Sequence, residues 1–542
     1  MPDRPTLASA ALAALLGTLP VLLVFHLAPL NPWNQGWLLA GPMGPDPVQL
    51  WLGWTYFVHS PWAWPPGANP DYGVELGTAI FFADAIPLLA LLGKALRGLV
   101  VLPQYVGPWL FLCGALQGLA AWALLGRATR APLARAMGAG LLALQPMLLN
   151  RMLGHTPLAG QFLLLLALWL ATSPGRGAWR ALAWAALLGV TALVHSYLLA
   201  MAVPLWVADA LRRLAPRSVV EALLVPAAIA GALWLAGFFL LQGGLDSGPG
   251  SEMGGYGTWN ADLLAWLDGG MWSALLPDLP GPDHWEAGSL YLGAGGLALL
   301  LLGAYAFARA PEAPPRRLWP LVAVLLALLG FAVTQHVTLG GGTLLELPLP
   351  EALVRRLSAL RNAERMAWPA GYTLLAAAVA LAARRWGGRR LGWVLAGVLA
   401  LQWADLAPGL AARHGLVAGA PAGVPQRLFD PFWAEAAPRY ARVRAVPAAN
   451  MGEGWESIAR FAAEARLPTD SIYMARVDGA AAAALRARMA EVLASGAYEP
   501  GTLYVLRDAA SLALAEASHR PERDLLRQAD GYWVLAPGWW VR

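Results

Sequence analysis

The sequence predicts an α-helical polytopic membrane protein that ends in a small α/β domain. Of its 542 residues, 58% are hydrophobic and only 13% are charged, a composition unlike that of a soluble globule of this length. Apolar stretches long enough to approach or cross a bilayer core of about 30 Å recur along the chain. We therefore predict a transmembrane domain over residues 1–407 and an extracytoplasmic α/β domain over residues 408–542.

Arginine clusters set the predicted topology. They lie at ends of apolar stretches, at Arg4, Arg127/Arg130/Arg135, Arg176/Arg180, Arg212/Arg213/Arg217, Arg309/Arg316/Arg317 and Arg384/Arg385/Arg389/Arg390. By the positive-inside rule these ends face the cytoplasm, which places the N-terminus inside and the C-terminal domain outside. The net charge of +5 is therefore a topology signal. Because the arginines are spread over many span ends, they do not indicate nucleic-acid binding.

About eleven spans follow from this topology. They are expected near 8–30, 104–126, 134–150, 158–172, 179–195, 197–211, 219–241, 289–309, 318–338, 367–384 and 390–407. The first has too long an apolar core, and no convincing cleavage site, for a signal peptide, so we expect it to be retained.

Residues 31–103 form a large first outer loop in this prediction. Its apolar stretch 78–101 is interrupted by Asp84, Pro87 and Lys94. If this stretch crossed the membrane, every later loop would change sides and the arginine clusters would face outward. We therefore expect a juxtamembrane or re-entrant helix pair on the outer face.

The tail from about residue 408 mixes charges of both signs, and its apolar runs are short. Its patterns predict helices at WESIARFAAEARLP and AAAALRARMAEVLASG, and strands at SIYMARV, TLYVLRD and YWVLAP. Such alternation is typical of a small α/β sheet. Because the tail has no catalytic or metal motif, we expect a lid or acceptor-docking module. The only cysteine, Cys113, lies in a span, which excludes a disulfide framework and a thiol-ligated metal site.

The first outer loop carries the strongest candidates for chemistry. Asp46 opens an expected short helix with Pro47 at its first position, followed by Gln49 and Trp54. An aspartate there is commonly a helix cap, although a cap also holds a carboxylate rigidly. The loop tryptophans suit either a membrane-interface belt or the apolar face of a sugar. Burying the carboxylate of Asp84, in FFADAIPLL, costs desolvation free energy unless it faces water, a partner or a ligand. Asp84 is therefore a functional candidate.

Further candidates lie in the other outer loops. Arg151 and His155 share the turn LLNRMLGHTPL, and His195 and Tyr197 share LVHSYLL. A histidine at a span end is usually a hydrogen-bonded interfacial residue and less often a substrate ligand.

Two loops supply the remaining charged candidates. The loop 242–288 holds seven acids and neither Lys nor Arg, with Glu286 close to the membrane. A divalent cation is possible there, but no ligand spacing supports one. Arg361 and Arg365, in RNAERMAWP, would point the same way at i and i+4 on a helix, and paired guanidinium groups suit a phosphate. A salt bridge with Glu364 or contact with lipid headgroups is the alternative.

A family resemblance joins these segments. In this order, GPDPVQLWLGW, PWAWPPGANPDYG, ADAIPL, RMLGH, LVHSYLL, YLGAG and RNAERMAWP resemble an uncharacterised bacterial integral-membrane family grouped with the GT-C glycosyltransferases. The resemblance covers nearly all of residues 30–405 and extends more loosely into the tail. It departs from the family pattern at Gln161, where a histidine is usual, and at Ala363-Glu364, where a Ser-Gly pair is usual.

The resemblance implies a GT-C-like enzyme of the bacterial plasma membrane that uses a polyprenyl-phosphate-linked sugar. Asp46 would act as general base or acceptor-positioning group, Asp84 as a second acid, and arginine would stabilise the departing lipid phosphate. The sugar would pass with inversion to an envelope glycan, lipid or protein.

Two other functions remain open. A transporter or flippase of lipid-linked glycans would place ionisable residues in the middle of spans, whereas Asp209, Glu221 and Asp405 are expected near span ends. A catalytically silent GT-C scaffold would look the same in sequence.

Overall fold

The computed structural model describes residues 6–40, 44–175, 177–213, 218–241, 255–281, 288–311, 315–421 and 423–541. It forms two compact units. Unit 1 comprises Met1–Asn34, Tyr105–Gly231 and Gly254–Ala420, and unit 2 comprises Gln35–Gln104, Ala232–Met253 and Pro421–Arg542. The first outer loop therefore groups with the C-terminal tail, whereas the sequence prediction placed it in the transmembrane domain. Arg4, Arg176, Arg217 and Glu286 lie outside the described residues.

Unit 1 is built from helices. Its α-helices are α1 (Leu7–Phe25), α2 (Leu27–Leu30), α6 (Val106–Leu125), α7 (Pro132–Ala143), α8 (Pro146–Leu149), α9 (Phe162–Thr172), α10 (Ala178–Val194), α11 (Ser196–Arg213), α12 (Ser218–Leu235, whose end enters unit 2), α13 (Gly293–Arg309), α14 (Trp319–Val333), α15 (Glu351–Leu357), α16 (Trp368–Arg385) and α17 (Gly388–Ala418). Short 3-10 helices are η3 (Asn150–Met152), η4 (Thr156–Ala159), η7 (Arg316–Leu318), η8 (Ser358–Leu360) and η9 (Ala363–Ala367), and β1 (His336–Leu339) pairs with β2 (Gly342–Glu346).

Every one of the eleven predicted spans contains an α-helix. Among the described residues, five helices are long and apolar enough to cross a membrane, and a sixth counts if the pair Pro132–Ala143 and Pro146–Met152, bent by 52°, is one span. These helices mark the chain as a membrane protein. The total of about eleven spans, the bacterial membrane and its predicted sides stay predictions.

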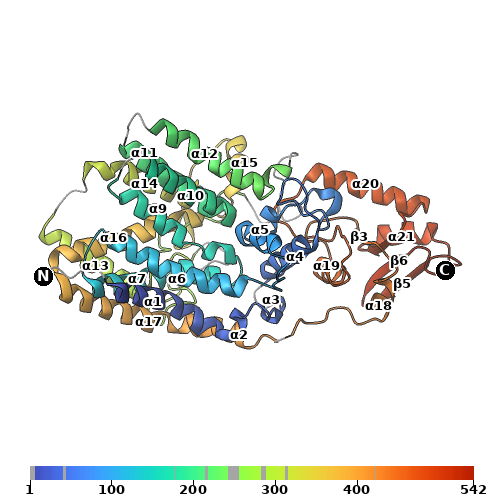
Figure 1. The fold of residues 1–542 in the computed structure, drawn as a ribbon, viewed down its shortest axis with the longest axis horizontal. Coiled ribbons are helices and arrows are strands. Elements are labelled where there is room, and N and C mark those ends of the chain that lie inside the picture. Colours follow the sequence, from blue (N-terminus) through green and yellow to red (C-terminus); the bar gives the residue numbers. More distant parts are fainter. Residues whose placement is uncertain are drawn as a thin grey trace. The chain divides into compact units, whose positions relative to one another are not determined.

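Small residues bring α1 and α6 together. A Cβ on Gly17 of α1 would lie 2.1 Å from the Gly114 carbonyl oxygen, and one on Gly118 would lie 2.0 Å from the Ala13 carbonyl oxygen. The two backbones therefore touch, as small residues spaced by four allow in membrane helices. Figure 1 shows α1 and α6 packed beside α7 and α17.

The helix α17 extends beyond its predicted end at residue 407. It continues through Pro408 to Ala418, so the tail begins later than expected. Asp405, predicted near a span end, lies inside this helix and is fully buried. Its carboxylate accepts hydrogen bonds from the Tyr291 hydroxyl and the Ala294 N–H, both at 2.8 Å, and from Ser273. These donors offset the cost of burying the acid.

Ion pairs join the helix ends that were predicted to face the cytoplasm. Asp209, in the last turn of α11, is 2.7 Å from Arg180 Nε of α10 and 2.6 Å from an Arg212 amino group. Arg213 extends this network to Glu221 in the first turn of α12, at 2.6 Å. The predicted positions of Asp209 and Glu221 at helix ends are therefore confirmed.

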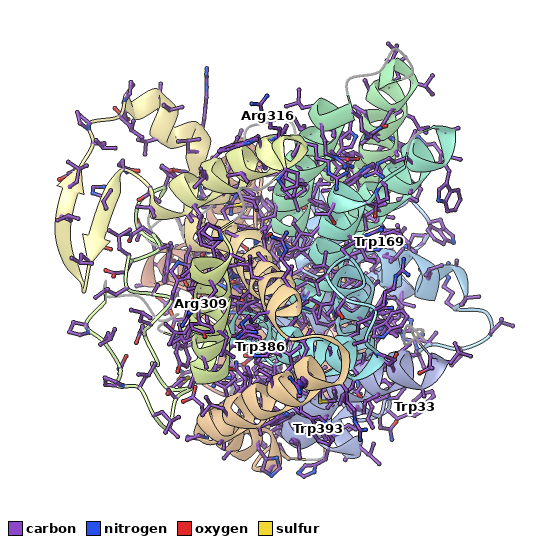
Figure 2. The ribbon with its side chains drawn as sticks, turned by 90° about the vertical axis from the view of Figure 1, so that its left-hand side faces the viewer. Trp33, Trp169, Arg309, Arg316, Trp386 and Trp393 are labelled. Atoms are coloured by element: carbon purple, nitrogen blue, oxygen red, sulfur yellow. The ribbon has the colours of Figure 1, made fainter. Side chains whose placement is uncertain are left out.

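Arginines and tryptophans also mark helix ends in unit 1. Figure 2 labels Arg309, Arg316 and Trp386 at such ends, and Trp393 in the second turn of α17. The Arg309 guanidinium lies 5.2 Å from the centre of the Tyr305 ring, which stacks on Trp386 at 6.3 Å. Mixed aromatic and cationic side chains of this kind are typical of the membrane–water interface.

Unit 2 combines the first loop with the tail. Its elements are α3 (Gly36–Leu39), α4 (Asp46–His59), η1 (Val74–Leu76), η2 (Ile80–Ala83), α5 (Pro87–Ala95), η5 (Phe238–Leu240), α18 (Phe432–Ala436), β3 (Arg442–Val446), α19 (Trp455–Glu464), α20 (Gly479–Ser495), β4 (Thr502–Leu506), α21 (Ala509–Ser518), β5 (Leu525–Ala529) and β6 (Tyr532–Ala536). The strands form a mixed sheet in the order β3-β4-β6-β5, in which only β3 and β4 are parallel.

The stretch 78–101 holds two helices, the 3-10 helix η2 and the α-helix α5. Their predicted place on the outer membrane face stays a prediction. α5 has nine residues, or about 14 Å, and is too short to cross a core of about 30 Å. Its basic end packs on the end of α4, where Lys94 donates to the Pro61 carbonyl at 3.2 Å and Arg97 to those of Val58 and Ser60 at 3.0 and 2.6 Å. Cations at a helix C-terminus satisfy its orphan carbonyls and its dipole.

The tail patterns predicted four of the eight helices and strands described there. The predicted helices correspond to α19 and α20, and TLYVLRD and YWVLAP to β4 and β6. The predicted strand SIYMARV is wrong: residues 471–477 make only an isolated bridge between Ile472 and Asn450. The Ala475 N–H instead donates to the Phe82 carbonyl in the first loop, at 2.8 Å. α18, β3, α21 and β5 were not predicted.

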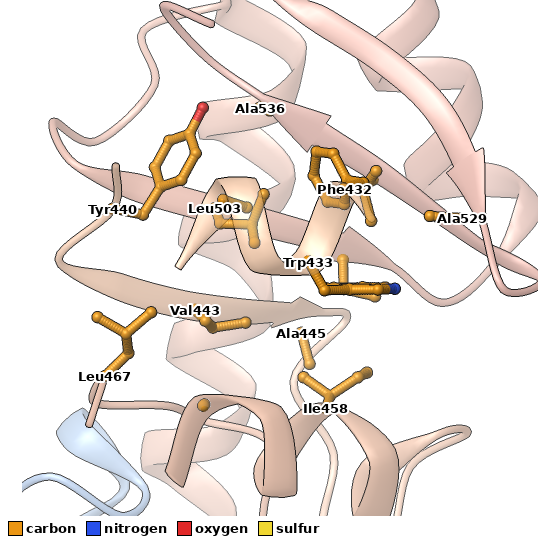
Figure 3. Packing of buried hydrophobic residues seen from close by; sticks show 14 residues of the cluster. Phe432, Trp433, Tyr440, Val443, Ala445, Ile458, Leu467, Leu503, Ala529 and Ala536 are labelled. Carbon is orange, nitrogen blue, oxygen red and sulfur yellow. The ribbon is translucent and has the colours of Figure 1, made fainter. Parts of the chain in front are cut away.

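An apolar core lies between the sheet, α18 and α19. Figure 3 shows Phe432 and Trp433 of α18 packed among Val443 of β3, Ile458 of α19 and Leu503 of β4. Trp433 buries its ring and donates its indole N–H to Asp530 at 3.0 Å. A buried indole requires such a partner.

We predict that Gly118→Val destabilises unit 1, because the added side chain enters the α1 backbone. Overpacking should lower the unfolding free energy by about 1–3 kcal/mol or more. Gly330→Val in α14 is the matched control, since a Cβ there meets no described atom within 4 Å. Thermal unfolding in detergent, followed by tryptophan fluorescence, compares the two variants. Equal melting temperatures would contradict the proposed close contact.

Candidate functional site

Asp46 is the first helical residue of α4. The sequence had predicted it to be the N-cap, one position earlier. The N-cap is Pro45, and Pro47 follows within the first turn. The cap interpretation of Asp46 is therefore wrong, although a carboxylate in the first turn still favours the helix dipole. Asp46 is half-buried, and its Oδ1 accepts a hydrogen bond from the Tyr473 hydroxyl at 3.3 Å. The carboxylate is thus oriented while part of it remains accessible.

Asp84 lies on a segment that is tied to the first turn of α4. It ends η2 in the left-handed conformation, with φ 53° and ψ 27°, which aspartate tolerates better than most residues. Gln49 donates from Nε2 to the Phe82 carbonyl at 3.3 Å. The structure therefore brings the segments of Asp46, Gln49 and Asp84 together.

A tail segment covers the same region. Tyr473 contacts Asp46, and Ala475 binds the Phe82 carbonyl that also accepts from Gln49. The Tyr473 ring packs against Trp455 at 5.4 Å. Sequence reasoning missed Tyr473, because nothing in its local pattern relates it to a loop more than 400 residues away.

Trp54 has the surroundings of a core residue. It is buried, and its indole N–H donates to the Leu102 carbonyl at 2.8 Å. A Cβ on Gly93 would come within 2.6 Å of its ring. Trp54 therefore packs α5 on α4, and its predicted contact with substrate stays a prediction.

An ion-pair network fastens the first loop to the tail. Arg444 of β3 is 1% exposed and lies 2.5 Å from Glu75, 3.2 Å from Asp470 and 3.3 Å from Glu499. Arg488 of α20 also binds Glu75, at 2.8 Å. Burial by itself would raise the pKa of Glu75, but the hydrogen bonds from Arg444 and Arg488 lower it to about 2. The network therefore requires ionised Glu75.

Unit 1 contains a separate group that we call the arginine–aromatic cluster: Arg151, Tyr197, Asn362, Arg365 and Trp368. The Arg151 guanidinium lies 6.0 Å from the centre of the Trp368 ring, and that of Arg365 lies 5.1 Å from the centre of the Tyr197 ring. The Asn362 N–H donates to the Tyr197 hydroxyl at 2.9 Å. Both arginines are buried. Arginines from two predicted site segments, 150–152 and 361–368, thus contact aromatic side chains within unit 1.

The predicted helical pairing of Arg361 with Arg365 is wrong. Arg361 follows η8, and Asn362 interrupts the chain with φ −84° and ψ 81° before η9 begins. The two arginines therefore do not lie at i and i+4 on one helix. Arg361 is half-buried, whereas Arg365 is buried. The neighbouring Glu364 accepts a hydrogen bond from Ser289.

The histidines have local roles in unit 1. His195 caps the end of α10, and its Nδ1 accepts a hydrogen bond from the Tyr197 N–H at 3.1 Å. His155 is the N-cap residue of η4 and is half-buried. Gln161, where the family pattern has histidine, is fully buried and accepts from the Tyr372 hydroxyl at 2.7 Å. Glu286 lies outside the described residues.

No predicted cation site is visible in the part of the chain that the structure describes, which holds no group of three or more His, Cys, Asp and Glu side chains suited to a metal. Asp262 accepts hydrogen bonds from the N–H groups of Leu264, Gly340 and Gly341 at 2.8–3.1 Å. Asp268 likewise accepts from the Leu279 N–H at 3.0 Å. These two acids organise loop backbone. A cation elsewhere in residues 242–288 stays a prediction.

Comparison with known families gives two matches. A model described as Domain of unknown function (DUF6311) matches residues 14–407, and the DUF6311 C-terminal domain matches residues 432–537. None of the curated proteins compared with the chain matches it.

Solved structures with some likeness include the archaeal oligosaccharyltransferase AglB from Archaeoglobus fulgidus in complex with an inhibitory peptide and a dolichol-phosphate. It is 14% identical with a TM-score of 0.43, over 99% of this chain and 74% of that chain. The oligosaccharyltransferase of the same organism in the apo form is 14% identical with a TM-score of 0.41, over 86% of this chain and 64% of that chain. The same enzyme tethered to an acceptor peptide is 14% identical with a TM-score of 0.42, over 98% of this chain and 74% of that chain. With so distant a likeness, function rests on the chain's own residues.

We predict that Glu75→Gln destabilises unit 2 at neutral pH. The pKa of Glu75 is about 2 in the fold and near its ordinary 4.5 in the unfolded chain, so its contribution is complete above pH 4.5 and is lost as the pH falls toward 2. Because the side chain is 34% exposed, solvent screening limits the loss of unfolding free energy to about 1 kcal/mol.

Thermal unfolding at pH 7 and pH 3 measures this effect. The difference between wild type and Glu75→Gln should shrink at the lower pH. Glu516→Gln, on the exposed surface of α21, is the control and should change neither curve. A variant as stable as wild type at pH 7 would contradict the anchoring role.

Proposed function

This chain belongs to the DUF6311 family, and we propose that it is a membrane glycosyltransferase that uses a polyprenyl-phosphate-linked sugar. The acceptor is a glycan, lipid or protein of the bacterial cell envelope, and the reaction takes place on the extracytoplasmic face. The resemblance to GT-C enzymes implies a single displacement with inversion of the anomeric centre. The observation that carries the proposal is the oriented carboxylate of Asp46.

Asp46 has the properties that a general base requires. Its carboxylate is half-buried at the start of α4, its Oδ1 is held by Tyr473, and Gln49 fixes the same turn of the helix. In the proposed step, Asp46 takes the proton of the acceptor nucleophile while that nucleophile attacks the anomeric carbon. The bond from the anomeric carbon to the phosphate oxygen breaks, and the lipid phosphate leaves.

Asp84 is proposed as the second acid, which positions the acceptor. It lies beside a segment bonded both to α4 and to the tail, through the Phe82 carbonyl. Gln49 and Trp54 belong to the same proposed region.

The arginine–aromatic cluster supports a role in binding an anion. Buried guanidinium groups present fixed donors that match phosphate oxygens, and nearby rings limit their motion. We assign the lipid phosphate to Arg151 and Arg365. The proposed accessory residues are His155, His195, Tyr197, Glu286 and Arg361.

Transport of a lipid-linked glycan has no specific observation in its favour. The buried acids Asp209 and Asp405 are held by arginines, hydroxyls and backbone N–H groups. Acids held in this way belong to a structural network rather than to a path along which ions move.

We predict that Asp46→Asn lowers sugar transfer by about 10²–10⁴-fold, the usual contribution of a general base. The assay uses purified protein, radiolabelled polyprenyl-phosphate sugars and envelope acceptors. Donor binding and thermal stability should be retained. Asp478→Asn is the control, because Asp478 caps α20 through the N–H groups of Ala480 and Ala481. Wild-type protein that binds donor and transfers no sugar to any acceptor would favour a transporter or a silent scaffold.

We predict that Arg365→Gln weakens binding of a polyprenyl phosphate by about tenfold or more, since a hydrogen bond to a charged group is worth about 1.5–3 kcal/mol. Arg355→Gln is the control, because the Arg355 side chain is 74% exposed on α15. Binding of a fluorescent polyprenyl phosphate to detergent-solubilised protein measures the difference. Equal affinity of both variants would remove Arg365 from the phosphate site.

A further inference from the structure

Arg413, in the last turns of α17, is a buried cation that no step of the proposed transfer uses. Its side chain belongs to unit 1, and the residue is 8% exposed. One amino group of its guanidinium donates to the side-chain oxygen of Asn150, and the other donates to the Gly409 carbonyl at 3.4 Å. Both acceptors are neutral, so neither balances the charge of Arg413.

The charge of Arg413 has no carboxylate beside it in the part of the chain that the structure describes. The acid on the same helix, Asp405, lies two turns earlier and is bonded to Tyr291 and Ala294. The charged group that acts on Arg413 is another cation, Arg151, which repels it. A buried charge is stable in a protein when an opposite charge accompanies it. Arg413 is therefore suited to hold an anion.

Trp272 fixes the plane of the Arg413 guanidinium. The guanidinium carbon lies 3.5 Å from the centre of the Trp272 ring. This ring packs on α17 at Gly409, where a Cβ would lie 2.5 Å from it, and its indole N–H donates to the same Asn150 oxygen at 3.2 Å. A guanidinium carries five N–H donors in one plane. Because the bonds to Asn150 and Gly409 do not use all of them, the remaining donors have fixed directions.

Asn150 joins Arg413 to the arginine–aromatic cluster. It is the residue before Arg151, and both belong to η3. The two guanidinium groups each lie near an indole, Arg413 at 3.5 Å from Trp272 and Arg151 at 6.0 Å from Trp368. Guanidinium groups held in this way match the oxygens of a phosphate, whose charge also removes the repulsion between them.

The position of Arg413 along α17 matches the depth of a lipid phosphate. α17 is long and apolar enough to cross a membrane, and its 31 residues extend over about 46 Å. A hydrocarbon core of about 30 Å takes about 20 residues. Counted from Arg390, near the start of the helix, the core is crossed before Arg413 is reached. The guanidinium therefore lies at the level of the lipid headgroups.

We propose that Arg413 is a further binding residue for the lipid phosphate of the sugar donor, next to Arg151. This inference rests on the proposed function, which assigns that phosphate to Arg151 and Arg365. Arg413 donates to a phosphate oxygen through the N–H groups that Asn150 and Gly409 do not use. Trp272 and Asn150 are positioning residues that hold the guanidinium in place.

Binding of a fluorescent polyprenyl phosphate to the full-length protein in detergent tests this residue. Arg413→Gln should lower the affinity by about tenfold or more, because a hydrogen bond from a charged donor is lost. Arg413→Lys keeps the charge without the planar fork, so its affinity should fall between those of wild type and Arg413→Gln. Arg390→Gln, at an exposed position near the other end of α17, is the matched control and should bind like wild type.

Asn150→Ala separates direct binding from support of Arg151. This variant removes the oxygen that links Arg413 to η3 and keeps the charge of Arg413. Its affinity should fall less than that of Arg413→Gln, whereas equal losses would show that Arg413 only positions η3 and would overturn the proposal. Melting temperatures show which variants are folded. If Arg413→Gln does not fold, Arg413→Lys decides, since an affinity equal to that of wild type would contradict direct contact.

Two further outcomes identify the source of the phosphate and the claim that fails. Unlabelled phosphatidylglycerol should compete only weakly, and competition as strong as that of unlabelled polyprenyl phosphate would overturn the assignment to the donor. Weakened binding in Arg365→Gln with full binding in Arg413→Gln would overturn this inference alone. A wild type that binds no polyprenyl phosphate would overturn the phosphate site as a whole.

Discussion

The buried guanidinium of Arg444 is the constraint on which unit 2 depends. A charge this deep is stable only if carboxylates surround it, and removing one partner leaves an uncompensated charge. Two of these partners, Asp470 and Glu499, come from the tail, whereas Glu75 comes from the first loop. The charge of Arg444 in the sheet is therefore fully balanced only when the first loop is in place. Tyr473, whose hydroxyl donates to Asp46, follows Asp470 of this network by three residues in the tail.

Unit 1 depends on close helix packing and on hydrogen bonds between its buried polar groups. Helices α1 and α6 approach through glycines, and buried polar side chains such as Asp405 and Gln161 are bonded internally, to Tyr291 and Tyr372. Without water, an unsatisfied group costs several kcal/mol. The departure from the family pattern at Gln161 fits this rule, because an amide both donates and accepts inside the helix packing.

The sequence predicted what depends on local pattern. Apolar runs located a helix in each expected span, and the amphipathic pattern located α19 and α20. Prediction from the sequence failed where contacts between residues far apart in the chain decide the structure. SIYMARV alternates like a strand, yet its Ala475 N–H binds the first loop. The run after residue 407 changes composition, yet α17 continues through Pro408. The Asp46–Tyr473 and Asn150–Arg413 contacts join residues 427 and 263 positions apart, and no spacing rule relates such pairs.

The separation of Asp46 from Tyr473 has a consequence for how the protein is made. The acid leaves the ribosome before its hydroxyl partner, which follows 427 residues later. At about 5–20 residues per second, this delay lasts roughly 20–85 s. During that interval the carboxylate has no Tyr473 to orient it. A chain truncated before residue 473 lacks this contact, so Tyr473 orients the acid only after synthesis has passed that residue.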